Sequence, residues 1–174
     1  MPINIFLLKT TTMLLCFFTF FGLLQEKGYG HCHTFLVQVT DGAADRHLSE
    51  EESSSADLLA KQLKDVEIAA VYSSDELCAV ETAQKIAQYH NLEVITDPAL
   101  RTLSPGTLFQ RIGAMRTFGV NLTCRHTGCS IVVVTHESLV NFVGRYTSGG
   151  FKKIPHFSFL EIGSDGRSMH IQTR

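Results

Sequence analysis

Short apolar runs and longer stretches with one apolar face alternate along the chain from residue 34 onward. Four short runs rich in β-branched residues predict strands over residues 34–39, 66–72, 92–95 and 130–135. Two further runs predict a hairpin around Ser164-Asp165-Gly166, with strands at 157–162 and 169–172. The run 130–135 is the most apolar of all, as expected for a strand inside a sheet.

Between these runs, apolar residues recur every three or four positions and predict helices. Ser49 and Glu52 have the spacing of a capping box, and an apolar stripe follows at Ala56, Leu59, Ala60 and Leu63. Further helices are predicted over residues 75–89, 108–118 and 137–146, the first of them ended by Asn91. This alternation indicates an α/β fold: a doubly wound, mostly parallel sheet with helices on both faces and a closing C-terminal hairpin.

The first thirty residues differ in character from the rest. Lys9 precedes an apolar run from Met13 to Leu24, and Gly28-Tyr29-Gly30 offers a cleavage site between small residues. This pattern is typical of a signal peptide, so we expect residues 1–30 to be removed and residues 31–174 to be exported, to the periplasm or outside the cell. The alternative is an uncleaved membrane anchor over residues 5–24.

Composition narrows the classes of partner. A chain of 174 residues with 18% charged residues and a formal net charge of −2 suits one ordinary domain, and it argues against nucleic-acid binding. Cleavage after Gly30 would leave four cysteines, and the sequence leaves open whether they form disulfides or remain thiols. They are Cys32, Cys78, Cys124 and Cys129.

One segment carries a family resemblance. Residues 70–83 read Ala-Val-Tyr-Ser-Ser-Asp-Glu-Leu-Cys-Ala-Val-Glu-Thr-Ala. They resemble the signature Y-S-S-D-x-x-R-A-x-x-T-A of the histidine phosphatase (phosphoglycerate mutase-like) superfamily. The length and the signal peptide are most similar to its short exported or phosphohistidine-phosphatase-like branch. The resemblance implies a phosphatase fold that needs no cofactor, with the active site beyond the carboxyl ends of the strands.

The same resemblance assigns roles at the end of the first strand. Active members carry Arg-His-Gly there, in which the histidine attacks phosphorus and the arginine binds phosphate oxygens. In this chain Gln38, Val39 and Thr40 occupy those positions, so the nucleophile and one arginine are missing. Asp41 follows at the position of a general acid, and it is equally compatible with a turn before Gly42.

The second and third strands complete the expected site. Cys78 stands where the family signature has its other phosphate-binding arginine, and Ser73 lies in the serine turn before it. His136, directly after the run 130–135, matches the family histidine that hydrogen-bonds the transferring phosphate. Gln38, Val39 and Cys78 are therefore expected to line a degenerate phosphate pocket in which His136 is retained.

Other residues could supply the missing chemistry. Arg46-His47 and Arg125-His126 resemble the lost motif, but neither pair directly follows a buried strand. A metal-assisted site would use the histidines together with Asp41. No cysteine has an arginine six residues later, so a cysteine-phosphatase loop is excluded.

Three functional hypotheses follow. The first is an exported pseudoenzyme that binds a partner, such as a phosphorylated small molecule or protein. The second is an active phosphomonoesterase or other hydrolase with a rearranged site around His136 and Asp41. The third is an interaction module that the uncleaved N-terminal segment tethers to a membrane.

Overall fold

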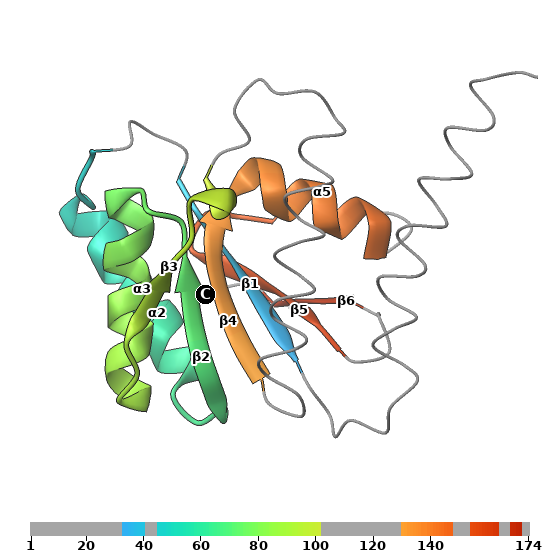
Figure 1. The fold of residues 1–174 in the computed structure, drawn as a ribbon, viewed down its shortest axis with the longest axis horizontal. Helices are drawn as coiled ribbons and strands as arrows, with labels where there is room; N and C mark the ends of the chain where they lie inside the picture. Colours follow the sequence, from blue (N-terminus) through green and yellow to red (C-terminus); the bar gives the residue numbers. More distant parts are fainter. Residues whose placement is uncertain (1–32, 41–44, 102–129, 148–153, 164–167, 172–174) are drawn as a thin grey trace, which may run out of the picture.

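The computed structural model describes residues 33–40, 45–101, 130–147, 154–163 and 168–171. Within these ranges one sheet has the strand order β3-β2-β4-β1-β5-β6 (Figure 1). Its strands are β1 (Thr34–Val39), β2 (Ile68–Ser73), β3 (Val94–Thr96), β4 (Ser130–His136), β5 (Ser158–Ile162) and β6 (Ser168–Ile171). The first four are parallel to one another, β5 is antiparallel to β1, and β6 is antiparallel to β5. The predicted mostly parallel sheet with a closing hairpin is confirmed.

Helices cover both faces of this sheet, as the alternating pattern predicted (Figure 1). Helices α2 (Glu50–Leu63) and α3 (Leu77–His90) pack on one face, and α5 (Glu137–Thr147) lies on the other. A short 3-10 turn, η1 (Pro98–Leu100), follows β3. No helix in the described part of the chain is long and apolar enough to cross a membrane.

Two buried clusters hold these layers together. Between the sheet and α2 and α3, the apolar stripe of α2 is buried with Val37, Val39 and Val134. Between the sheet and α5, Leu36, Tyr72 and Val133 pack with side chains of that helix. Because side chains alternate along a strand, β1, β2, β4 and β5 each contribute to both clusters. The stripe at Ala56, Leu59, Ala60 and Leu63 is confirmed as a core face.

Local hydrogen bonds explain where the element boundaries differ from the sequence prediction. The N–H of Val66 bonds to the carbonyl of Leu63, so β2 starts two residues later than expected. Asn91 adopts the left-handed conformation and the N–H of Leu92 bonds to Ala87, so β3 pairs with β2 only from Val94. The capping box of Ser49 and Glu52 is present as predicted.

Some predictions fall outside the described residues. They are the signal segment 1–30, the helix expected over 108–118, the hairpin turn at 164–166, Asp41, the Arg125-His126 pair, and the cysteines at 32, 124 and 129.

Candidate functional site

The carboxyl ends of β1, β2 and β4 meet at one edge of the sheet because these strands run parallel. Val39, the last residue of β1, pairs with His136, the last residue of β4. Ser73, the last residue of β2, pairs with Val134. Helices α3 and α5 begin just after β2 and β4, so their N-termini lie at the same edge. Helix N-termini attract anions, and this edge therefore has the backbone features of an anion site.

His136 is fully buried at this edge. Its Nε2 atom lies 3.1 Å from the hydroxyl of Ser74, which directly follows β2. The same nitrogen lies 3.0 Å from a carboxylate oxygen of Glu76. A serine and a carboxylate thus flank His136. The Glu76 oxygen lacks hydrogen-bond geometry toward the described residues, so its contact with the ring is one of proximity, which becomes an ion pair when the ring is protonated.

Glu76 occupies an unusual position for an N-cap residue. It precedes α3 with extended backbone angles, and its carbonyl accepts the first helical hydrogen bonds, from Ala79 and Val80. N-cap side chains usually accept a hydrogen bond from their own helix, but the Glu76 side chain makes no such bond. The residue is only 6% exposed, and its carboxylate is directed to His136 instead.

Val39 and Cys78 form an apolar wall beside this pair. Val39 is fully buried, and its register places it next to His136 on the face of the sheet that α2 and α3 cover. Cys78, near the start of α3, is 1% exposed, and its sulfur lies 3.9 Å from the carbonyl oxygen of Thr40. Burial and then the charge of Glu76 raise the pKa of the Cys78 thiol, so it is neutral near pH 7.

Gln38 is placed differently from Val39. It is fully buried and belongs to the opposite face of the sheet, because neighbouring residues of a strand point to opposite sides. Its side-chain amide nitrogen lies 3.5 Å from the Nδ1 atom of His156, and its main-chain carbonyl accepts a 2.7 Å hydrogen bond from the N–H of Phe157. Ser73 shares the face of His136, and its buried hydroxyl has no hydrogen-bond partner among the described residues.

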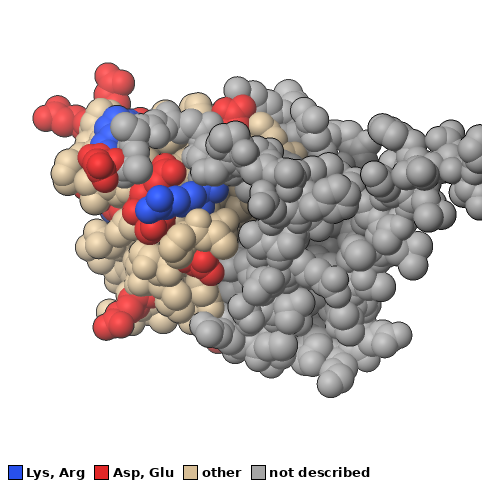
Figure 2. Space-filling model, turned by 45° about the horizontal axis from the view of Figure 1, so that its top comes forward, with Lys and Arg blue, Asp and Glu red and all other residues tan. Residues whose placement is uncertain are grey.

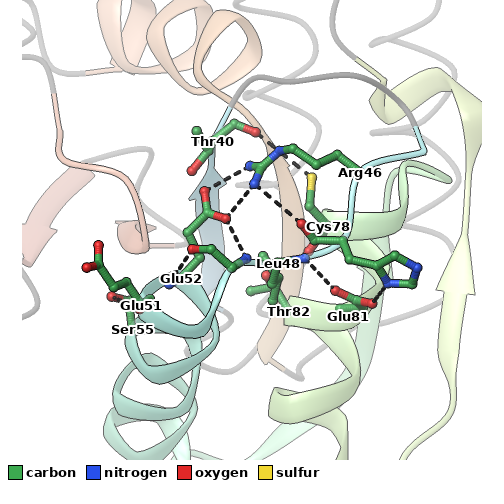
Figure 3. A network of polar contacts seen from close by, with 11 residues as sticks. Thr40, Arg46, Leu48, Glu51, Glu52, Ser55, Cys78, Glu81 and Thr82 are labelled. Carbon is green, nitrogen blue, oxygen red and sulfur yellow. Dashed lines mark hydrogen bonds and ion pairs between the residues drawn. The ribbon is translucent and has the colours of Figure 1, made fainter.

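The Arg46-His47 pair fixes the segment before α2 (Figure 3). The Arg46 guanidinium binds both carboxylate oxygens of Glu52, at 2.6 and 2.8 Å. His47 lies 2.5 Å from Glu81 of α3, which also accepts the N–H of Leu48. The His47 side chain is 75% exposed and lies against this surface carboxylate, so the pair serves to anchor the segment to α2 and α3.

Carboxylates also hold the second arginine near this edge. Arg101 forms a two-point ion pair with Asp75, the aspartate of the serine-turn signature, with Nη2 at 2.6 Å from one oxygen. On the face shown in Figure 2, basic side chains likewise lie directly beside acidic ones. The two arginines whose side chains the structure describes, Arg46 and Arg101, are therefore both neutralised by carboxylates of this chain.

The sequence analysis did not identify Ser74 and Glu76 as site residues. Their position in the sequence could have identified them, because both lie in the turn between a buried strand and a helix, at the carboxyl edge of the sheet. Among the described residues, no three His, Cys, Asp or Glu side chains are grouped so that they could hold a metal ion.

Comparison with known proteins adds independent findings. The family model for the histidine phosphatase superfamily (branch 1) matches residues 31–116. No curated protein sequence matches the chain. YhfR of Bacillus stearothermophilus has a similar structure, with a TM-score of 0.69 and 17% identity over 81% of this chain and 96% of that one.

Two further similar structures contain oxyanions. The protein histidine phosphatase SixA in complex with tungstate has a TM-score of 0.62 and 20% identity, over 80% of this chain and 94% of that one. A mycobacterial glucosyl-3-phosphoglycerate phosphatase in complex with VO3 has a TM-score of 0.62 and 15% identity, over 83% of this chain and 100% of that one. The family match, the sheet order and the serine-turn signature together assign this chain to the histidine phosphatase superfamily, with a fold like that of its phosphohistidine-phosphatase branch.

Proposed function

We propose that residues 31–174 form an exported binding or regulatory domain that has lost phosphohistidine-based catalysis. The observation that carries the proposal is the place of Val39. Valine has no lone pair with which to attack phosphorus, and its side chain is fully buried beside His136, where the family motif places the nucleophile.

The charges around this edge support the same conclusion. Hydrogen bonds to charged groups contribute about 1.5–3 kcal/mol each, so replacing two bidentate arginines by Gln38 and Cys78 weakens phosphate binding by orders of magnitude. Cys78 is neutral, and Gln38 is engaged near His156 on the other face of the sheet. A phosphorylated small molecule or protein remains the first partner class to test, with the expectation of weak binding.

A phosphatase assay tests this proposal directly. Purified wild-type protein and a His136→Ala variant are compared for hydrolysis of p-nitrophenyl phosphate. We expect no turnover by the wild type above that of the variant. Turnover by the wild type that disappears in His136→Ala would overturn the proposal.

A second candidate function is a hydrolase with a rearranged site. The observation that favours it is the 3.1 Å distance from Nε2 of His136 to the Ser74 hydroxyl, which is within reach for a base that activates a nucleophile. Against it, both residues are fully buried, and Glu76 contacts the same nitrogen rather than the opposite one. Hydrolysis of esters or phosphomonoesters that is lost in both Ser74→Ala and His136→Ala would establish this alternative.

Export is part of the proposal and has its own test. Cleavage after Gly30 predicts that the mature protein, recovered from the periplasm or the medium, begins at His31. N-terminal sequencing of that product checks the prediction. A membrane-bound product that begins at Met1 would instead support the tethered module.

A further inference from the structure

The carboxyl edge of the sheet has features that attract an anion, but cationic side chains near it already lie beside carboxylates of the same chain. Among the described side chains, two arginines and one histidine near this edge each face a carboxylate of the same chain. Arg46 is paired with Glu52, Arg101 with Asp75, and His136 with Glu76. The first two pairs are partly exposed, whereas the third is buried.

Several observations locate the Glu76 carboxylate. One of its oxygens lies 3.0 Å from Nε2 of His136. Its charge also helps to raise the pKa values of Cys78 and Arg101. The residue directly precedes the fourteen-residue helix α3, whose N-terminus carries a partial positive charge. The carboxylate is therefore at the point where histidine, helix and strand ends converge.

The geometry of Glu76 does not serve the helix itself. Its side chain makes no capping hydrogen bond, although it is the N-cap residue. A carboxylate at 6% exposure is costly to bury without a counter-charge, and His136 is the partner it reaches. This placement is explained if the carboxylate lies against the histidine as a counter-charge in the absence of an external anion.

We propose that Glu76 is a built-in anion, whose carboxylate occupies the place of an oxyanion ligand against His136 and makes the site reject phosphate-like dianions. The inference rests on the proposed function, because a working phosphatase would need this place open. It identifies the class of ligand that the site excludes and the residue that excludes it. Phosphate, which brings only further negative charge and mainly acceptor atoms, is opposed by the carboxylate through direct repulsion.

Binding of inorganic phosphate and tungstate to matched variants tests this proposal. Glu76→Gln keeps the shape of the side chain and removes its charge. Glu67→Gln makes the same change of net charge at an exposed position before β2, at the opposite end of the strand. Isothermal titration calorimetry should show at least about tenfold tighter anion binding by Glu76→Gln than by wild type, because a full charge has been removed from a buried site. Glu67→Gln should match the wild type.

A second variant tests whether the gain in anion binding depends on His136. Adding His136→Ala to Glu76→Gln should abolish the gain, because the anion would then lack its main partner. Equal anion affinity in folded Glu76→Gln and Glu67→Gln would overturn the proposal. If Glu76→Gln does not fold, Glu76→Ala provides the same comparison with the carboxylate removed altogether.

The outcomes also separate this inference from the proposed function. Phosphatase turnover by the wild type would refute the loss of catalysis, whatever the variants bind. An inactive wild type together with unchanged anion affinity in Glu76→Gln would refute only the built-in anion. An inactive wild type with a gain of binding supports both.

Discussion

Glu52→Gln is the substitution that best isolates one electrostatic interaction in this fold. Glu52 is the third residue of α2 and has two roles: it closes the capping box with Ser49, and it binds the Arg46 guanidinium at two points. Glutamine also closes capping boxes, so the variant preserves the helix start and removes only the charge. The segment before α2, which lies beside Cys78, then loses its ion pair with α2 and keeps its contacts with Glu81 of α3 (Figure 3).

The magnitude follows from the pKa of Glu52, which the hydrogen bond from Arg46 lowers from 4.5 to about 2. One pKa unit corresponds to about 1.4 kcal/mol, which sets an upper bound of about 3 kcal/mol. The side chains of Arg46 and Glu52 are 36% and 18% exposed, so solvent screens the pair. We therefore expect Glu52→Gln to lower the free energy of unfolding by about 1–2 kcal/mol near neutral pH.

The pH dependence has a defined sign. Because folding depresses the pKa of Glu52, its contribution is fully present above pH 4.5, the unfolded value, and is lost as the pH falls through about 2. Urea denaturation of wild type and Glu52→Gln should thus give a stability difference that is largest near neutral pH and shrinks in acid. Glu51→Gln, on the exposed neighbour, should cost less than about 0.5 kcal/mol. A difference between wild type and Glu52→Gln that is independent of pH would refute the reasoning.

The remaining predictions concern other parts of the fold. Ser49→Ala removes the N-cap of α2 and should lower stability by about 1 kcal/mol in chemical denaturation, whereas Ser49→Asp should not. Leu59→Ala opens a cavity in the fully buried layer under α2 and should cost about 2–5 kcal/mol, while Leu58→Ala on the exposed face should cost far less. Cys78 should resist alkylation by iodoacetamide near neutral pH, because burial raises the pKa of its thiol, and it should react once urea unfolds the protein. Peptide mass spectrometry measures the alkylated fraction, and rapid alkylation of the native protein would contradict the prediction.

Much of the fold could be predicted because its signals are local. The apolar run 130–135 and the stripe of α2 each match one secondary structure, and the capping box marks its helix within a residue. The boundaries of β2 and β3 could not be predicted as well. They depend on single backbone hydrogen bonds, from Val66 to Leu63 and from Leu92 to Ala87, which have no distinct pattern in the sequence.

The strand ends at which the candidate residues lie were predictable, but the contacts of these residues were not. The resemblance located Val39 and His136, and the strand register places them side by side. It did not indicate that Glu76 would turn from its helix toward His136, because an acidic residue before a helix ordinarily favours the helix start. Nor did it distinguish the face of Gln38 from that of Val39, although strand alternation implies the difference.

The most direct measurement asks whether this chain can carry a phosphoryl group on histidine. Wild-type protein is incubated with a radiolabelled phosphoryl donor such as phosphoramidate, and acid-labile protein-bound label is counted. The combined Gln38→Arg, Val39→His and Cys78→Arg variant, which restores the family residues, is treated alongside. The account predicts no label on the wild type, because Val39 stands where the nucleophile would be. Acid-labile label on wild-type protein, at a stoichiometry approaching one per chain, would contradict it.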